Sequence, residues 1–498
     1  MINTLTRTVL AAVGLAAIGA CQDTAVPNFR SPQINAETPA GIQYLVTGVV
    51  ANSRTDLGQD IVSLSGFDRD MGVFTAVDSR FITELMGDGN TIPNSDFYGE
   101  GGWSVEFANA KDAEAIIQDL PKVSPAYSAS DASLIAGVMK TFEAYNMLLV
   151  AETRDTLGVP IFGFVATAAN PAPFLCIRDV WKGIAAMLDS AEADLDAGKP
   201  GPLPITLPPG FGTANQAGPS GTAGTFAGLN RALAAYAKFQ YAYGATRVTG
   251  GTPATVSTPG SPLASALTSA DSAVHASWMY NPGALTPPAA GDFSDPMAVY
   301  HNFSSTSGDA DNPVTFSVGQ TTTLYVLDTV AAEIAAGGDL RANKLMTNTQ
   351  APNSAAGPAA NAQVANMVTV GFYETASSPI PIIRDEELVL IEAAIQLGEG
   401  NLSNAIASIN AIRTNVGKVG IYNPATPSYV GVRDQLLHEM RASNIGEPGE
   451  ERLMAVRNYG LQMPQTQTWG KTDLHTTLLP VPIQESGPRN GAIAPACQ

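Results

Sequence analysis

Basic residues are scarce in this sequence of 498 residues. Lysine and arginine number 26 against 45 aspartates and glutamates, so the formal net charge is −19. Proteins bind nucleic acid largely by neutralising phosphates with lysine and arginine, so we expect no nucleic-acid partner. Charged residues make up 14% of the chain and hydrophobic residues 45%, a composition that can form a core and does not indicate disorder.

Cysteine is rarer still, with residues at positions 21, 176 and 497. None belongs to a Cys-x-x-Cys pair, so thioredoxin-like and zinc-ribbon chemistry are not expected. Cys176 and Cys497 could pair in an oxidising compartment, but their spacing does not show whether they come close enough in space. The sequence leaves this disulfide open.

Only the N-terminus has a pronounced apolar run, and this run is too short to span a bilayer. It covers Thr8–Ala20 after a single charge at Arg7, whereas a transmembrane helix needs roughly 20 apolar residues. A charged start, a short apolar segment and small residues before a cleavage point are typical of a secretory signal peptide, here residues 1–20. The final residues, Ile18-Gly19-Ala20-Cys21, resemble a bacterial lipobox, in which the cysteine thiol takes the lipid.

Lipidation of Cys21 would anchor the remaining chain, residues 21–498, to a membrane. Acyl chains contribute about 0.8 kcal/mol for each buried CH₂, and more than one chain makes a stable anchor. Gln22 stands where an inner-membrane lipoprotein is expected to have aspartate, which favours the outer membrane. The alternative is an ordinary secretory signal followed by an incidental cysteine. We expect a lipid-anchored outer-membrane protein that faces the cell exterior.

Sequence motifs of the common enzyme classes are missing. The chain has no Gly-x-Ser-x-Gly, Gly-x-Gly-x-x-Gly, phosphate-binding P-loop or His-Glu-x-x-His pattern. Histidines occur at 275, 301, 438 and 475 without metal-ligand spacing, so we expect no metal, cofactor or catalytic residue. Adjacent residues on a helix point in different directions, so Glu386-Glu387 and Glu450-Glu451 are interpreted as surface or helix-capping carboxylates. We expect Glu451 and Arg452 to form buried or half-buried polar contacts.

Hydrophobic residues repeat at steps of three and four in several segments, which predicts a mainly α fold. Such stripes occupy residues 131–154, 181–195, 226–243 and 402–416. Ser130-Asp131 is predicted to cap the first of these helices. Residues 386–416 predict two helices joined at Gly398–Asn401, packed as in a tetratricopeptide hairpin. We expect one helical domain over 21–498, with helix pairs at about 103–246 and 383–460, and little β-structure beyond a strand at Met367–Tyr373.

Stretches rich in Gly, Pro, Ser and Thr separate the helices, at about 199–224 and within 247–382. Such stretches are predicted to form irregular loops, and loops on a rigid scaffold often carry binding residues. Aromatic faces can stack on sugar rings, and side-chain amides can supply hydrogen bonds at the rim of a site. The alternative is that these side chains pack the loops onto the core. The candidate ligand-binding residues are Asn94, Phe97, Tyr98, Trp278, Tyr280, Tyr300, Asn302, Phe303 and Trp469.

Seven segments share a recognisable order along the chain: Trp103–Ala110, Leu157–Pro160, Ile383–Gly398, Ala405–Arg413, Leu436–Arg441, Glu450–Gly460 and Leu478–Ile483. Together, and most clearly between 383 and 460, they resemble the SusD/RagB proteins. The third is similar to the family's arginine-led helix, the fourth to its Ile-Asn-x-x-Arg helix and the last to its proline-rich tail. A glutamate replaces the glycine of the family's Glu-Gly-x-Arg pattern, and no tryptophan follows Arg452, so the resemblance is to a distant member.

The resemblance implies a SusD-like helical fold with embedded tetratricopeptide-type units. It further implies a non-catalytic lipoprotein that captures an oligosaccharide or peptide and docks on a TonB-dependent, SusC-like outer-membrane transporter. Two other classes remain open from the residues alone. One is a surface glycoside hydrolase, and the other is a helical-repeat lipoprotein that assembles envelope proteins.

Overall fold

The structure is a computed structural model. It describes residues 38–74, 78–95, 101–123, 126–160, 172–248, 256–289, 295–306, 309–314, 324–449, 451–461 and 477–487. The predicted signal peptide 1–20, Cys21 and the candidates Phe97, Tyr98 and Trp469 lie outside these residues. Cys176 is disulfide-bonded, and its partner also lies outside them.

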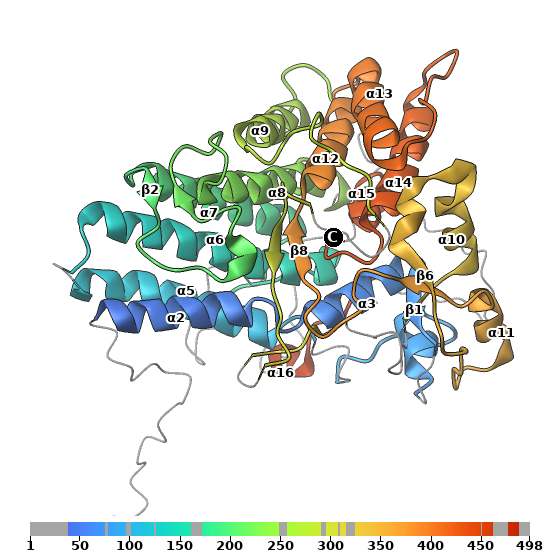
Figure 1. Ribbon diagram of the computed structural model, residues 1–498, viewed down its shortest axis with the longest axis horizontal. Coiled ribbons are helices and arrows are strands. Elements are labelled where there is room, and N and C mark those ends of the chain that lie inside the picture. The colour runs from blue at the N-terminus through green and yellow to red at the C-terminus, as the bar shows by residue number, and fades with distance from the viewer. Residues whose placement is uncertain are drawn as a thin grey trace, which may run out of the picture.

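Helices dominate the described part of the chain. They are α2 (Pro39–Asn52), α3 (Leu57–Phe67), α5 (Ser104–Asp119), α6 (Ala129–Arg154), α7 (Ile177–Asp196), α8 (Phe226–Val248), α9 (Pro262–Ala276), α10 (Asp328–Ile334), α11 (Pro358–Asn361), α12 (Asp385–Gly398), α13 (Leu402–Ala411), α14 (Tyr429–Asn444), α15 (Glu451–Asn458) and α16 (Ile483–Ser486). Consecutive helices from α5 to α9 pack against one another, and α12 packs against α9, α13 and α14. Figure 1 shows the first group as a stack beside the second.

The strands are short and form antiparallel pairs. They are β1 (Met71–Val73), β2 (Gly201–Pro202), β3 (Gln216–Ala217), β4 (Val299–His301), β5 (Leu324–Val326), β6 (Leu345–Thr347), β7 (Val368–Val370) and β8 (Ile380–Ile383). The pairs are β1–β5, β2–β3, β4–β8 and β6–β7. The expected strand at Met367–Tyr373 is present as β7. The mainly α fold with little β-structure predicted from the sequence is confirmed.

Helix α6 lies at the centre of the first group. Its stripe from Leu134 to Leu149 is buried, as the periodicity predicted. The cap lies two residues earlier than predicted, because Ser128 and Asp131 bond reciprocally to each other's backbone N–H groups, both at 3.1 Å. The segment Ala129–Leu157 is long and apolar enough to cross a membrane, but 89% of its most apolar window is buried inside the protein. Core helices have the same composition.

The predicted hairpin is formed by α12 and α13. Gly400 makes the turn between them with a φ of +80°, a conformation that residues with a Cβ rarely adopt. Gly398 ends α12 where the helix approaches α8 and α9, and a Cβ at this position would lie 2.3 Å from the Tyr243 hydroxyl. The glycines in this turn therefore allow both the reversal and the close approach.

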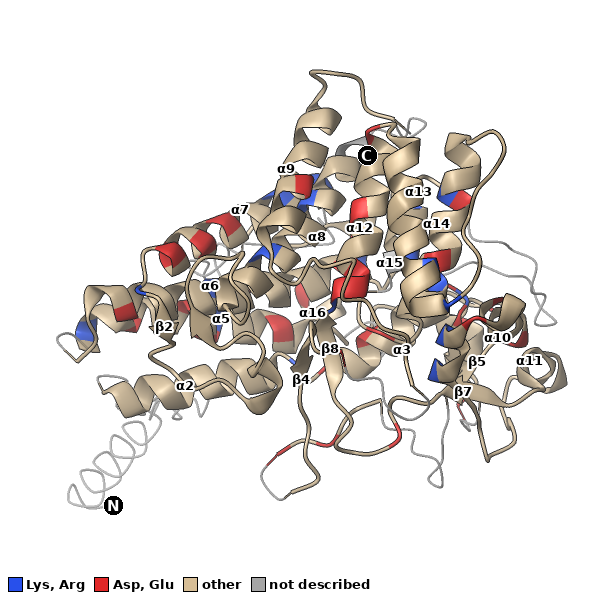
Figure 2. Cartoon of the chain, turned by 45° about the horizontal axis from the view of Figure 1, so that its top comes forward, with Lys and Arg blue, Asp and Glu red and all other residues tan. Residues whose placement is uncertain are grey.

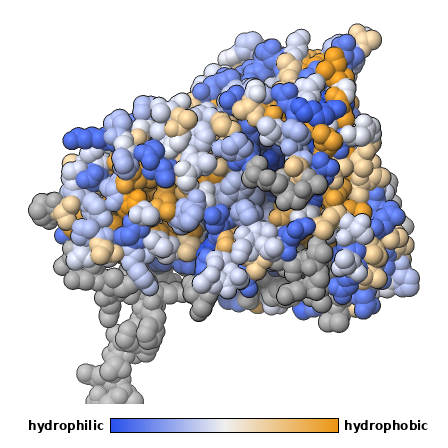
Figure 3. Space-filling model, in the orientation of Figure 1, coloured by the Kyte–Doolittle hydropathy of each residue, from blue (hydrophilic) through white to orange (hydrophobic). Residues whose placement is uncertain are grey.

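The outer surface is not continuously apolar. Figure 3 shows a mostly hydrophilic face on which hydrophobic residues gather in separate patches. Charged residues also lie inside the molecule, where α12, α14 and the neighbouring strands meet (Figure 2). These interior charges border the candidate site.

Candidate ligand-binding site

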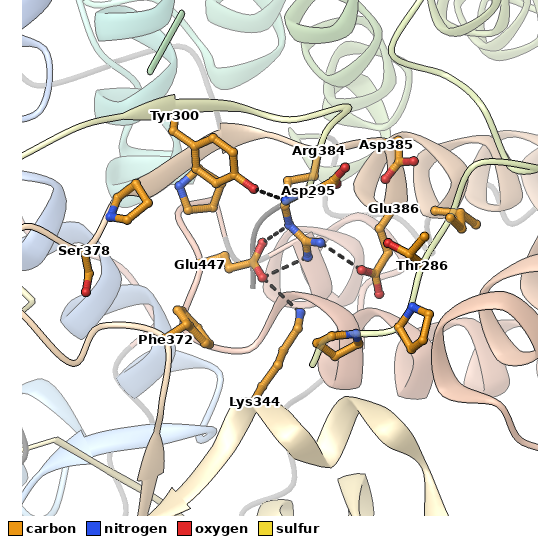
Figure 4. A pocket seen from close by; sticks show the side chains of 15 residues that line it. Thr286, Asp295, Tyr300, Lys344, Phe372, Ser378, Arg384, Asp385, Glu386 and Glu447 are labelled. Atoms are coloured by element: carbon orange, nitrogen blue, oxygen red, sulfur yellow. Dashed lines mark hydrogen bonds and ion pairs between the residues drawn. The ribbon is translucent and has the colours of Figure 1, made fainter. Parts of the chain in front are cut away.

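A cavity of ≈ 380 Å³ lies beside the junction of β8 and α12. Segments distant in sequence form its walls: the loop after α9, strand β4, the helical turn Leu340–Lys344 and the turn after α14 (Figure 4). Its lining residues are Leu285, Thr286, Pro287, Pro288, Asp295, Tyr300, Lys344, Phe372, Ser378, Pro379, Pro381, Arg384, Asp385, Glu386 and Glu447. Its volume falls in the range of small-molecule sites, roughly 300–1,000 Å³.

Arg384 is the centre of the cavity's polar wall. Strand β8 ends at Ile383, so Arg384 is the extended residue that precedes the first turn of α12. Its guanidinium holds Glu447 through two hydrogen bonds, from Nε to Oε2 at 2.7 Å and from Nη2 to Oε1 at 2.8 Å. Its Nη1 donates to Glu386 Oε2 at 2.8 Å, and Nη2 also donates to the Ser443 carbonyl at 3.0 Å. The guanidinium is therefore fixed in one orientation.

Lys344 extends this cluster from the opposite wall. Its ammonium group lies 3.0 Å from Glu447 Oε1 and also donates to the Ser443 carbonyl. Glu447 thus accepts from two cations, and Figure 4 shows the three side chains converging. Because Lys344, Arg384 and Glu447 are all buried, removing one would leave a buried charge without its partner.

A second cluster of buried ion pairs adjoins the first and is linked to it through Ser443. Arg341 is fully buried and contacts Asp339 at 2.6 Å and Glu439 at 2.5 Å. Glu439 also contacts Arg413 at 2.6 Å, and Arg341 Nη1 donates to the Ser443 hydroxyl at 3.1 Å. Ser443 therefore joins the two clusters, with its hydroxyl in one and its carbonyl in the other.

The carboxyl groups at the start of α12 differ in their protonation. Burial, together with the nearby Asp295 carboxyl, raises the pKa of Asp385 to about 8. Burial alone would also raise the pKa of Glu386, but Lys344 and Arg384 outweigh it and hold that pKa at about 2. At neutral pH Asp385 is thus largely a hydrogen-bond donor, whereas Glu386 is an acceptor.

The remaining wall is aromatic and apolar. Tyr300 lies on β4, paired with Pro381 of β8, and its hydroxyl oxygen accepts a hydrogen bond from the Asp295 N–H at 2.8 Å. Burial raises the pKa of Tyr300, so its hydroxyl stays protonated. Phe372 and the prolines at 287, 288, 379 and 381 complete this side. The cavity lining thus combines aromatic rings and prolines with donors and acceptors that are fixed in place.

A larger groove of ≈ 590 Å³ runs between α2 and α5. Its lining includes Tyr44, whose side chain is 64% exposed, and one buried polar side chain, Asn109. The amide of Asn109 already donates to the Val49 carbonyl at 2.9 Å and to Asn146 Oδ1 at 3.2 Å. The cavity at Arg384 has more buried polar groups directed into it and is the stronger candidate.

Of the described candidates chosen from the sequence, Tyr300 lines the Arg384 cavity. Asn302 and Phe303 follow it in the chain, and Phe303 is buried with the Arg54 guanidinium 4.9 Å from its ring centre. Asn302 is half-buried beside Gly210. Neither Asn302 nor Phe303 is among the residues that line this cavity.

The other described candidates make packing contacts elsewhere. Trp278 lies over Gly228 and donates from Nε1 to the Thr225 carbonyl at 2.9 Å. Tyr280 packs its ring against His275, with 4.8 Å between the ring centres. The Asn94 side-chain amide donates to the Ser486 hydroxyl at 3.4 Å.

Most residues of the cavity were not selected from the sequence. Arg384 appeared there only as part of the SusD/RagB-like segment, and Glu386 only as one of a pair of surface or capping carboxylates. Glu386 does lie in the first turn of α12, but the surface interpretation is wrong because the residue is 3% exposed. Arg452 is buried as expected, and its guanidinium contacts Asp68. A signal for Arg384 was its position between a β-rich segment and an acidic helix start.

Comparison with solved structures identifies the architecture. A SusD superfamily protein from Bacteroides vulgatus superposes with a TM-score of 0.63 at 13% identity, over 91% of this chain and 97% of that chain. The chain has the SusD fold. A SusD superfamily protein from Bacteroides thetaiotaomicron gives a TM-score of 0.61 at 16% identity, over 90% and 98% of the two chains. A SusD-like carbohydrate binding protein from Bacteroides vulgatus gives 0.57 at 13% identity, over 85% and 84%.

The likeness is one of structure more than of sequence. No protein-family model matches the chain, and no curated protein matches it. The predicted SusD-like architecture is nevertheless confirmed across about nine-tenths of the chain. The chain therefore shares the fold of these structures at 13–16% sequence identity.

Proposed function

We propose that this chain is a distant SusD/RagB protein that binds carbohydrate in the cavity at Arg384 without cleaving it. The observation that carries the proposal is that aromatic residues and prolines line the same cavity as fixed buried polar groups, inside a SusD fold. One solved structure with this fold is described as a SusD-like carbohydrate binding protein, which supports the same ligand class. The volume of ≈ 380 Å³ suits a short sugar segment.

The charges favour a sugar without an acidic group. The cavity wall carries four carboxyl groups, at Asp295, Asp385, Glu386 and Glu447, against the two cations Lys344 and Arg384. A negative excess remains even when Asp385 is protonated. An anionic sugar would meet this excess, whereas the hydroxyl groups of a neutral sugar can donate to carboxylates and accept from Asp385.

The proposed cellular role is delivery of this ligand to a TonB-dependent outer-membrane transporter. It rests on the lipobox-like sequence ending in Cys21 and on the resemblance to SusD/RagB proteins. Labelled palmitate should be incorporated into the wild-type protein and not into Cys21→Ala. Recovery of a barrel transporter with the affinity-purified protein would support delivery, whereas recovery of other envelope machinery would support the assembly alternative.

Binding can be tested with a glycan array followed by calorimetry on the best neutral oligosaccharide. Phe372→Ala should weaken binding at least about tenfold, because it removes one of the aromatic rings that line the cavity. Tyr44→Ala is the matched control, since Tyr44 is an exposed aromatic residue on α2, outside this cavity. If Phe372→Ala binds as tightly as wild type, the sugar does not bind in this cavity.

A glycoside hydrolase is a second candidate, because one carboxyl with a raised pKa lies beside one with a lowered pKa, as in acid–base pairs. Against it, Glu386 is held by Arg384 and acted on by Lys344, an arrangement typical of a structural anchor. Incubating the purified protein with the oligosaccharide that it binds distinguishes a binding protein from a hydrolase. Release of shorter sugars by wild type and not by Asp385→Asn would favour the hydrolase.

A further inference from the structure

Three side chains that can bind metals meet between α9 and α12, away from the Arg384 cavity. Asp271 and His275 are four residues apart on α9, so they lie on the same face of that helix. Glu392 lies on α12, which packs beside α9 (Figure 1). One ligand atom from each residue lies within 4.8 Å of the other two.

Their spacing is close to that of a metal's ligands. His275 Nε2 lies 3.5 Å from Asp271 Oδ1 and 3.8 Å from Glu392 Oε1. A tetrahedral zinc ion with bonds of about 2.0–2.1 Å holds its ligand atoms about 3.3 Å apart. The two distances from His275 exceed this edge by about 0.2 and 0.5 Å, and the two carboxylates lie within 4.8 Å of each other, so side-chain movements would bring all three groups to coordinating distance. The His275 side chain is 52% exposed, which leaves a path for an ion to enter.

Glu392 points to a missing positive charge. The residue is 5% exposed, and its Oε2 is buried without a hydrogen-bond partner. The charged groups that act most strongly on Glu392 are Asp271 and Glu399, which are both acidic. By contrast, Glu386, Glu439 and Glu447 each contact an arginine. A buried carboxylate needs a partner of opposite charge, and the described neighbours of Glu392 supply only His275.

The surroundings also orient the three side chains. The Gln396 amide donates to Glu392 Oε1 at 2.8 Å, as outer-shell groups do for metal-binding carboxylates. The Tyr280 ring packs edge-on against the His275 imidazole.

We propose that Asp271, His275 and Glu392 form a binding site for a divalent transition-metal ion of the zinc type, which ties α9 to α12. Two carboxylates balance the charge of the ion, and one imidazole favours zinc over calcium or magnesium, which prefer oxygen ligands. The three protein ligands leave a further coordination position for water. Residues 277–288 run from the end of α9 to the cavity wall at Leu285–Pro288, so the ion would also fix the base of that loop.

The test is a zinc titration of the purified tag-free protein after dialysis against a chelator, followed by calorimetry and thermal unfolding. The wild type should bind one Zn²⁺ at this site, and its melting temperature should rise by about 3 °C at a hundredfold excess over Kd. Ca²⁺ and Mg²⁺ at the same concentration should give no such rise. Glu392→Gln and His275→Ala should each weaken zinc binding by more than about tenfold.

The matched control is His438→Ala. His438 contacts the Glu333 carboxylate at 2.9 Å, and Arg441 contacts the same carboxylate at 2.6 Å. His438 thus has a carboxylate partner, as His275 does, but that carboxylate is already paired with an arginine. This variant should bind zinc as wild type does. Without zinc, Glu392→Gln should melt no lower than wild type, because it removes a buried charge that repels Asp271. Absence of zinc binding by wild type, or equal affinity in Glu392→Gln, would overturn the proposal.

Discussion

Replacing Arg384 with methionine would test whether the buried charges hold the cavity together. Methionine keeps most of the side chain's length and apolar packing but removes the guanidinium. Glu447 would lose two hydrogen bonds and keep Lys344, and Glu386 would lose its bond of 2.8 Å to Arg384. The variant therefore leaves carboxylates buried with less than their full set of partners.

The expected loss of stability at pH 7 is about 3–5 kcal/mol, the usual cost of removing one partner from a buried ion pair. The pKa of Glu386 gives an independent figure. A shift from an ordinary 4.5 down to about 2 corresponds to about 3 kcal/mol, to which Lys344, Arg384, the Ser443 hydroxyl and Arg341 all contribute. The folded-state pKa is depressed, so this contribution is present above pH 4.5 and is lost as the pH falls toward 2. The difference between wild type and variant should therefore shrink, to roughly half near pH 3.

Urea unfolding at pH 7, 4.5 and 3 measures this difference. Arg178→Met is the matched control, because Arg178 and its partner Asp179 are 3.0 Å apart on the surface, with 48% and 42% exposed side chains. Exposed pairs of this kind contribute about 0–1 kcal/mol, so the control should unfold close to wild type. If Arg384→Met lost no more stability than the control, or lost the same amount at every pH, the reasoning about the buried cluster would be refuted.

Two further predictions concern α12. Asp385 has a folded-state pKa of about 8, raised from 3.8, so it stabilises the fold at acid pH and loses this contribution as the pH rises toward 8. In thermal unfolding, Asp385→Asn should thus be as stable as wild type near pH 4 and more stable than wild type near pH 8. A variant that is less stable than wild type at pH 8 would contradict the raised pKa of Asp385. Gly398→Ala should cost about 1–3 kcal/mol because its Cβ would overlap the Tyr243 hydroxyl, whereas Gly420→Ala, with open space around it, should be nearly neutral in the same urea assay.

Helices could be predicted well because their signal is local. The 3.6-residue stripe placed the first long helix at 131–154, and α6 occupies Ala129–Arg154. Helix ends were less certain, since several serines near this end can act as caps. Ser128 takes the cap, while the neighbouring Ser130 hydroxyl accepts from the Lys199 N–H at 2.8 Å. Ser128 is the cap because Asp131 completes a reciprocal pair of hydrogen bonds with it, whereas Ser130 makes a tertiary contact.

The cavity could not be predicted in the same way, because its polar wall is assembled from distant residues. Glu447 lies 63 residues from Arg384 and 103 from Lys344. Charged residues are expected at the surface, so the sequence does not show which of them are buried together. Aromatic residues predicted the cavity poorly because an aromatic side chain can either line a site or pack a loop onto the core. Tyr300 lines the cavity, whereas Trp278 and Phe303 make packing contacts.

Helix α12 carries two charge arrangements that suit different ligands. At its start, arginine and lysine neutralise the carboxylates of Glu386 and Glu447, so the cavity there suits a neutral polar molecule. Six residues after Glu386, about 9 Å along the helix, the charged groups that act most strongly on Glu392 are acidic and its ion-pair partner is a histidine, which suits a cation. The two ligands should therefore bind independently to first order. Phe372→Ala should still bind zinc, and Glu392→Gln should still bind sugar, so that the failure of either proposal would be seen without the other.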